Sequence, residues 1–354
     1  MLNDQGLRTI EQISCCAASK DMEQQEWMTG FITTPSGKVP VVSTDLSRKD
    51  ITGRWKARWG IGRMKYTVEP GLYTVGSPDS SSPVFVSANY KMSFDYLRKD
   101  LRNINGWILV LDTKGINVWC AAGKGTFGTD ELVKRISQVH LDRVVKHREL
   151  ILPQLGAPGV AAHAVKRKSG FSISYGPVLS RDIHAYLAGD RKATPAMRSV
   201  PFKLKDRAVL IPMELIPSLK LLPYIFFLLI ALQLINYGLF PVKDLLLLVP
   251  FTGAIIMGTV LFQLLLPWIP FRSFVVKGWI LGLLWSLVVS TGMTFENWQS
   301  AGWYFLLPPI TAFLAENFTG STTFTHLSGV KIELKYGLPV MLISVIIGIV
   351  LQFL

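Results

Sequence analysis

The pattern of apolar and polar positions changes near the middle of the chain. After Lys220, five long stretches are nearly free of charge, and each is close to the ~20 residues that a helix needs to cross a bilayer. These stretches are residues 221–240, 245–268, 278–295, 297–315 and 336–354. Pro308 and Pro309 interrupt the fourth, which predicts a kink or a re-entrant segment there. We therefore expect residues 219–354 to form an all-α transmembrane domain of five helices.

Before residue 219 the apolar runs are short and alternate with helical patterns. Residues 107–111 (WILVL) read as a strand that is buried on both faces of a sheet. Other strands are predicted at residues 84–87, 150–152, 171–175 and 209–211, and a hairpin is predicted from residues 65–68 and 72–75 around a Pro-Gly turn. Ser93 and Thr129 are predicted to be the N-caps of two helices, and further helices are predicted to cover residues 160–166 and 181–187.

This alternation predicts a Rossmann-like α/β domain over residues 54–218, with ligands at the carboxyl ends of its strands. Residues 1–53 show no sustained periodicity, so we expect a weakly structured N-terminal lead-in. A cluster of Arg, Lys and Trp at residues 54–65 indicates contact with anionic lipid or an acidic protein partner rather than with nucleic acid.

The charge balance agrees with a soluble part followed by a membrane part. The chain has 37 Lys and Arg against 24 Asp and Glu, a net charge of +13, yet only 17% of its residues are charged. Soluble proteins carry about 25% charged residues, so a wholly soluble chain is excluded. With the α/β domain in the cytoplasm, the inner loops carry Arg272, Lys277, Lys331 and Lys335, as the positive-inside rule requires. We expect a multi-pass protein of the inner, cytoplasmic membrane with its C-terminus on the outer side and no secretory signal.

The cysteines are few and lack the spacing of a cluster site. The chain has three, Cys15, Cys16 and Cys120, whereas an iron–sulfur or structural zinc site needs about four ligands in paired spacings. We therefore expect no iron–sulfur cluster in this chain.

Cys120 stands in the most informative segment, residues 112–128, which follows the WILVL strand. The sequence after it is Ala-Ala-Gly, so whatever the sulfur contacts can lie flat against bare backbone. A phosphate-binding loop fails, because Val118 stands where that motif needs glycine. Two chemistries stay open: a nucleophilic thiol with a base nearby, and a soft thiolate ligand for a metal in a large flat cofactor.

The string Asn117-Val118-Trp119-Cys120-Ala121-Ala122-Gly123-Lys124 resembles the cap-helix signature of the mercury-methylating corrinoid proteins, the HgcA family. The similarity continues through residues 58–60, 66–76, 86–91 and 125–132 and the membrane tail. It implies a Rossmann-like corrinoid-binding domain similar to that of the large subunit of the corrinoid iron–sulfur protein. Cobalamin would bind with its own base displaced.

The resemblance also assigns site residues. Cys120 would be the catalytic residue and the lower axial ligand of cobalt. The cap helix beneath the ring would comprise Asn117, Val118, Trp119, Ala121, Ala122, Gly123 and Lys124, with Ser87 and Asn89 as further contacts at a strand end. Lys124 would either contact the cofactor's polar groups or be solvated at the helix end. Cys15 and Cys16 would be free thiols or a relay for mercury.

The implied reaction transfers a methyl group from Cys-ligated methylcobalamin to Hg(II) and forms methylmercury. The methyl group would come from the folate-linked one-carbon pool, and a ferredoxin with two [4Fe–4S] clusters (HgcB) would return the cofactor to Co(I). The alternatives are a corrinoid methyl carrier with another acceptor, a membrane-bound sensor of corrinoid or metal, and a thiol enzyme without a cofactor.

Overall fold

The computed structural model describes residues 25–238, 242–293, 297–318, 324 and 327–352. The chain divides into two compact units, an α/β domain (residues 1–57 and 62–200) and a helical unit (residues 58–61 and 201–354). The helical unit thus begins ahead of the boundary expected at residue 219, because residues 201–218 fold into helices of that unit.

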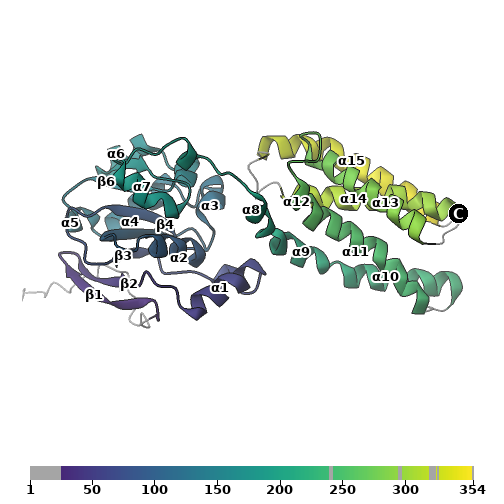
Figure 1. Ribbon diagram of the computed structural model, residues 1–354, viewed down its shortest axis with the longest axis horizontal. Coiled ribbons are helices and arrows are strands. Elements are labelled where there is room, and N and C mark those ends of the chain that lie inside the picture. The colour runs from purple at the N-terminus through teal and green to yellow at the C-terminus, as the bar shows by residue number, and fades with distance from the viewer. Residues whose placement is uncertain (1–24, 239–241, 294–296, 319–323, 325–326, 353–354) are drawn as a thin grey trace, which may run out of the picture. The chain divides into compact units, whose positions relative to one another are not determined.

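The α/β domain contains a seven-stranded mixed sheet with helices on both faces (Figure 1). Its strands are β1 (Met28–Thr34), β2 (Gly37–Val42), β3 (Gly71–Val75), β4 (Val84–Ala88), β5 (Gly106–Leu111), β6 (Glu149–Leu152) and β7 (Ser172–Tyr175). Its α-helices are α1 (Arg48–Arg58), α2 (Lys91–Asp100), α3 (Val118–Lys124), α4 (Thr129–Gln138), α5 (Leu141–Val144), α6 (Ala162–Ser169) and α7 (Ile183–Ala188). Short 3-10 turns include η1 (Arg63–Lys65), η2 (Gln154–Gly159), η3 (Ser180–Asp182) and η4 (Ala196–Arg198).

The strand order is β1-β2-β3-β5-β4-β6-β7. The four strands β5, β4, β6 and β7 are mutually parallel, whereas β3 pairs antiparallel with β5 and β1 antiparallel with β2. In the parallel part the first strand, β4, lies between the second and the third, which is the order of a doubly wound sheet. Such sheets bind ligands where the strand order reverses, at the carboxyl ends of the strands.

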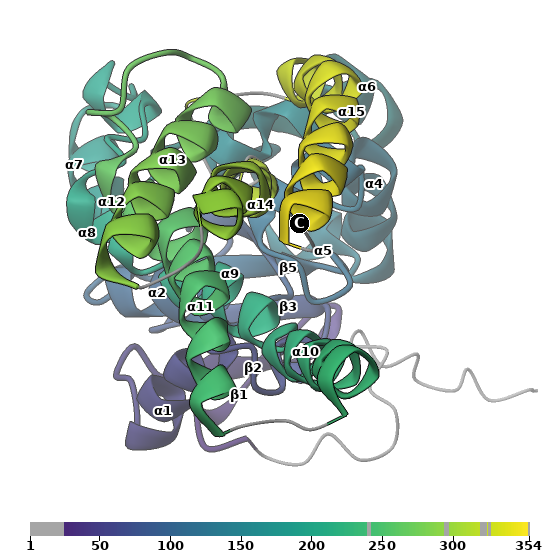
Figure 2. The same ribbon diagram turned by 90° about the vertical axis from the view of Figure 1, so that its right-hand side faces the viewer.

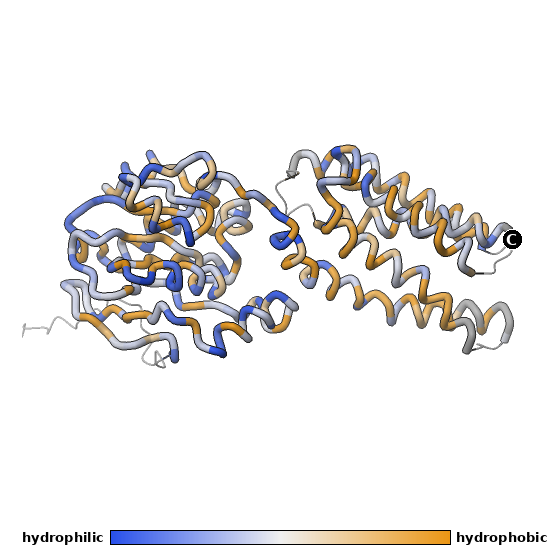
Figure 3. Tube along the Cα trace, in the orientation of Figure 1, coloured by the Kyte–Doolittle hydropathy of each residue, from blue (hydrophilic) through white to orange (hydrophobic). Residues whose placement is uncertain are grey.

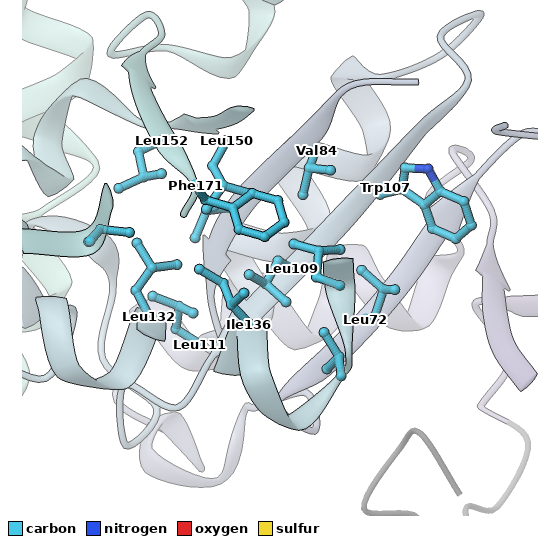
Figure 4. Close-up of a cluster of buried hydrophobic side chains, with 14 of the residues drawn as sticks. Leu72, Val84, Trp107, Leu109, Leu111, Leu132, Ile136, Leu150, Leu152 and Phe171 are labelled. Carbon is cyan, nitrogen blue, oxygen red and sulfur yellow. The ribbon is translucent and has the colours of Figure 1, made fainter. Parts of the chain in front are cut away.

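Two apolar cores hold the sheet. On one face, Leu109 and Leu111 of β5 pack with Leu132 and Ile136 of α4, as Figure 4 shows. On the other face, Ile108 and Val110 pack with residues of α2 and α7. All six positions of β5 are buried, which explains why its residues form a continuous apolar run. The strand predicted at residues 107–111 is therefore confirmed. The predictions at residues 84–87, 150–152 and 171–175 are confirmed as β4, β6 and β7 to within one or two residues.

Several local expectations are wrong. Residues 25–53 are not weakly structured, since they form β1, β2 and the start of α1. Few of their side chains are buried, so this segment has too few apolar residues to show a sustained periodicity. The hairpin around Pro70 does not form, because both edges of the fully buried β3 are taken by β2 and β5. The strand predicted at residues 209–211 does not form, because residues 209 and 210 are a turn between two helices and Ile211 begins the second of them. The predicted caps are also displaced, with Tyr90 and Gly128 in place of Ser93 and Thr129.

A buried network of charges fixes α1 to α2. The carboxylate of Asp50 on α1 pairs with Arg98 at 2.7 Å and with Lys91 at 2.6 Å, and Asp95 pairs with both of these cations. Arg98 and Asp95 have no exposed surface. Every charge in this group has an opposite partner, which is the condition under which buried charges are tolerated.

The helical unit contains α8 (Leu204–Ala208), α9 (Ile211–Leu219), α10 (Leu222–Tyr237), η5 (Val242–Leu247), α11 (Leu248–Ile256), the π-helical turn η6 (Met257–Leu261), α12 (Phe262–Leu265), α13 (Phe274–Gly292), α14 (Asn297–Asn317) and α15 (Leu327–Gln352). Within the described residues, four helical stretches are long and apolar enough to cross a membrane: Leu204–Ala231, Leu245–Leu265, Phe274–Gly292 and Gly329–Gln352. The predicted count of five spans is not confirmed, since the stretch at residues 297–315 does not qualify. Figure 3 shows the apolar positions running along these helices.

Helix α14, which contains Pro308 and Pro309, packs between α13 and α15 (Figure 2). Because Pro309 has no N–H, the carbonyl of Phe305 loses its usual helical donor. The hydroxyl of Ser344 on α15 donates to that carbonyl at 2.8 Å. The helix therefore continues through both prolines, and a neighbour satisfies one freed backbone group.

Candidate functional site

The site predicted from the sequence lies at the carboxyl edge of the parallel strands. In register, Ser87 of β4 stands beside Val110 of β5, and Ala88 beside Leu111. The chain leaves β5 through the loop of residues 112–117 and enters α3. It leaves β6 directly into η2. The two helical segments that follow β5 and β6 thus meet at the edge where doubly wound sheets bind ligands.

The side chain of Asn89 holds the loop before α3 in place. The side-chain oxygen of Asn89 accepts hydrogen bonds from the backbone N–H groups of Thr113 at 3.1 Å and Gly115 at 3.0 Å. Asn89 is buried, at 6% exposure. Its observed role is to position the loop, and contact with a cofactor stays a prediction.

A charged pair stiffens the outer part of the same loop. Burial raises the pKa of Asp112, but the ammonium and backbone N–H of Lys114 outweigh it, so this pKa lies below its ordinary value. The ammonium lies 2.5 Å from the carboxylate. Asp112 is therefore a carboxylate at neutral pH, and the loop presents a paired charge next to α3.

Helix α3 contains the whole predicted string in seven residues plus its caps. The side chain of Asn117 accepts a hydrogen bond from the backbone N–H of Cys120 at 2.9 Å, which satisfies a donor in the first turn. The helix ends at Gly125, whose φ of 79° is readily adopted only by glycine. The predicted residues are thus brought together in one short, capped helix.

The two sides of α3 differ in what they contact. Ala121 and Ala122 are buried against the core of the domain. Cys120 is half-buried, and Gly123, one turn further along, is exposed. A Cβ atom added at Gly123 would meet no atom within 4 Å. The thiol and this open glycine share a helix face, because residues three apart lie one above the other.

The backbone of η2 packs closely against α3 and the residues that follow it. A Cβ atom at Gly159 would lie 2.1 Å from the carbonyl oxygen of Phe127 and 3.0 Å from the Cα of Ala122. Only glycine fits at this position. The sequence analysis did not identify Gly159; the signal that could have found it is the glycine-containing run 153–159 directly after a strand.

The other predicted residue, Ser87, is buried at the end of β4, with its hydroxyl 3.3 Å from the carbonyl of Ala88. Cys15 and Cys16 lie outside the described residues. In the part of the chain that the structure describes, no histidine is hydrogen-bonded to Cys120, and no three His, Cys, Asp or Glu side chains form a metal-binding group. Among the described residues, the thiol of Cys120 thus has no hydrogen-bonded histidine as a base.

A shallow depression of about 680 Å³ lies elsewhere, lined by residues 32–35, 77–80, 107, 142–146 and 148. It contains none of the predicted site residues. Its lining includes the loops before β4 and after α5, at the opposite end of the parallel strands, so we do not assign the site to it.

Comparison with known proteins relates this region to corrinoid proteins. Residues 61–187 match the family model described as the CO dehydrogenase/acetyl-CoA synthase delta subunit. The acetyl-CoA decarbonylase/synthase complex subunit gamma of Archaeoglobus fulgidus is 31% identical over 127 residues, which is 35% of this chain and 27% of that protein. The corrinoid/iron-sulfur protein large subunit of Moorella thermoacetica is 27% identical over 121 residues, 34% of this chain and 27% of that protein.

The chain thus spans about a quarter of the length of these relatives. The residues that the family model matches, 61–187, lie in the α/β domain except for residue 61, and they include β4, β5, α3 and η2, the elements that build the site. The matches support a corrinoid-binding domain, of a family related to methyl transfer, in the first half of this chain.

Proposed function

We propose that the α/β domain binds a corrinoid on the open face of α3, with Cys120 as the lower axial ligand of cobalt, and that the protein methylates Hg(II). The observation that carries the proposal is the face that Cys120 shares with Gly123, where a side chain would meet no atom within 4 Å. It stands in a domain related to corrinoid proteins.

The residues present suit such a ligand. A flat macrocycle needs a broad surface without projecting side chains, and α3 offers Gly123 and Gly125 after Cys120. The thiol is free and half-exposed, so a metal can approach it. Sulfur is a soft donor of the kind that transition metals favour. The face of α3 therefore fits a corrinoid bound with its own base displaced.

When bound, the corrinoid supplies a cobalt centre that carries a methyl group. The chain's own contribution is position and electron donation. Asn117 fixes the first turn of α3, and Gly159 lets η2 support the helix from below. As a ligand of the cobalt, the Cys120 thiolate would donate electron density to it, and this would favour transfer of the methyl group as a carbanion. Hg(II), an electrophile, accepts a methyl group in that form.

Two partners complete the proposal. A ferredoxin with two [4Fe–4S] clusters supplies electrons, and a folate-linked donor supplies the methyl group. The helical unit anchors the protein in the cytoplasmic membrane, with the α/β domain on the cytoplasmic side, a role supported by its four apolar stretches.

A methyl carrier for another acceptor is the second candidate. It is favoured by the similarity to gamma subunits of acetyl-CoA decarbonylase/synthase complexes. The two candidates share the site and differ in the acceptor alone.

The test supplies both kinds of acceptor to the same protein. Full-length protein in nanodiscs, loaded with cobalamin and an isotopically labelled methyl group, receives Hg(II) in one reaction and a small thiol in another. We expect labelled methylmercury from the wild type, none from Cys120→Ala, and slower formation from Cys120→His. Transfer to the thiol without methylmercury would support the second candidate. Equal methylmercury from Cys120→Ala would contradict the ligand assignment.

A further inference from the structure

Exposed apolar side chains of the α/β domain are concentrated in one short stretch of its chain. Among the described residues of this domain, four large apolar side chains are exposed, and three of them, Ile51, Trp55 and Met64, lie on α1 and η1. Their exposed fractions are 51%, 57% and 65%. We call the outward side of α1 and η1 the α1 surface. Such clustering is a mark of an interaction site, whereas single exposed apolar residues are ordinary.

The opposite side of α1 is firmly attached to the domain. Asp50 is paired with Lys91 and Arg98, and the ring of Tyr66 lies so close to Gly53 that an added Cβ would be 2.8 Å from it. The hydroxyl of Tyr66 also donates to the carbonyl of Asp50 at 3.2 Å. Because this inward side is fixed, Ile51 and Trp55, four residues apart, are held on the outward side.

The charge of the α1 surface has a single sign. Four exposed cationic residues lie on it in the α/β domain, Arg48, Lys49, Lys56 and Lys65, of which Lys49 is paired with Glu26. Two further cations, Arg54 and Arg63, are half-buried over tyrosine rings. The one acidic residue of the same two elements is Asp50, which is buried and paired. Figure 3 shows hydrophilic and hydrophobic positions alternating along α1. The α1 surface thus combines positive charge with aromatic and aliphatic side chains.

We propose that the α1 surface binds the anionic headgroups of a lipid bilayer. Cations are attracted to anionic lipid, while Trp and aliphatic side chains enter the boundary between headgroups and acyl chains. A bilayer is within reach, because the first candidate span begins at Leu204, four residues after the α/β domain ends at Val200. A bilayer matches both features of the surface, since its anionic headgroups attract the cations and its boundary layer receives the exposed Ile51, Trp55 and Met64.

Hydrogen exchange of the full-length protein in nanodiscs tests the proposal. One set of discs contains phosphatidylcholine alone, and the other contains added phosphatidylglycerol. We expect amides of residues 48–65 to exchange roughly fivefold more slowly in the anionic discs, and high salt to remove most of the difference. Amides of α4 should be unaffected by lipid composition.

Matched variants separate the surface from the overall charge. Lys56→Glu with Lys65→Glu removes two exposed cations from the α1 surface and should abolish the lipid effect. Lys134→Glu with Lys166→Glu makes the same change on exposed positions of α4 and α6 and should preserve it. Equal exchange of residues 48–65 in both kinds of disc would overturn the proposal. So would protection that arises only when a ferredoxin is added, which would assign the surface to a protein partner.

Discussion

Three helical glycines have opposite surroundings in the two units of the protein. Two of them lie in α13 of the helical unit, and the third lies in α3 of the α/β domain. In α13, a Cβ at Gly282 would lie 2.4 Å from the Cα of Pro308, and one at Gly278 would lie 2.6 Å from the Cα of Ala312. In α3, a Cβ at Gly123 would meet no atom within 4 Å. The glycines of α13 are already covered by α14, whereas the glycine beside Cys120 is uncovered. The comparison distinguishes a glycine that serves packing from one that leaves room for a ligand.

The largest effect is expected where the glycine is covered. Gly282→Leu would push a side chain into the backbone of α14 and should destabilise the helical unit by more than about 4 kcal/mol. We expect loss of its cooperative thermal transition in detergent, with corrinoid binding by the α/β domain retained. A near-normal melting temperature would show that this glycine is not needed for packing.

The next effect concerns the charge network that holds α1. Asp50→Asn leaves Arg98 buried with one ion-pair partner fewer and should lower the free energy of unfolding of the α/β domain by about 3 kcal/mol. Asp130→Asn, which breaks the exposed pair with Lys168, is the control and should cost less than about 1 kcal/mol. Denaturant unfolding measures both.

The same carboxylate predicts acid sensitivity. Burial raises the pKa of Asp50, but the hydrogen bond and charge of Lys91, the Ser47 backbone and Arg98 together lower it from 3.8 to about 2. A depressed pKa stabilises the folded state above the unfolded value, and that stabilisation is lost as pH falls through the folded value. Stability should therefore decline between pH 3.8 and about 2, and Asp50→Asn should remove this part of the decline. An identical acid profile in the variant would contradict the assignment.

A smaller but more specific effect is expected at the uncovered glycine. Gly123→Leu should weaken corrinoid binding about 100-fold, or about 2.7 kcal/mol, because the side chain would occupy the ligand's place. Stability should not fall, since leucine favours a helix by up to about 1 kcal/mol over glycine. Gly30→Leu in β1, where an added Cβ is equally unobstructed, is the matched control. Absorbance titration with cobalamin decides, and unchanged affinity in Gly123→Leu would place the ligand elsewhere.

The smallest effect is expected at the start of α3. Asn117→Ala removes the cap on the Cys120 N–H and should lower stability by about 1 kcal/mol. Asn117→Asp keeps an acceptor at the same position and should restore most of it. Thermal unfolding of the two variants provides the comparison, and an equal loss in both would mean that the cap is not the cause.

Much of the α/β domain could be predicted from local patterns. The strands at residues 84–88 and 106–111 are continuous apolar runs, and such runs need the burial on both faces that the structure shows. These strands depend on short-range chemistry, which is visible in the sequence. The helix around Cys120 was implied by the family resemblance instead, and Val118–Lys124 form one helix.

The remaining features depend on contacts between distant residues. Asn89 holds a loop more than twenty residues away, and Gly159 is close to Phe127 and Ala122 only in the folded chain. The edge hairpin β1–β2 buries few side chains, so its apolar pattern is weak. The fourth membrane stretch carries two prolines, and its packing between α13 and α15 is set by its neighbours.

The central claim is that Cys120 ligates a corrinoid. The most direct test is the ultraviolet–visible spectrum of full-length protein, purified without oxygen and reconstituted with cobalamin, for the wild type and Cys120→Ala. We predict a base-off, thiolate-ligated spectrum in the wild type that is absent from the variant. A wild-type protein that binds no corrinoid, or an unchanged spectrum in Cys120→Ala, would contradict the claim.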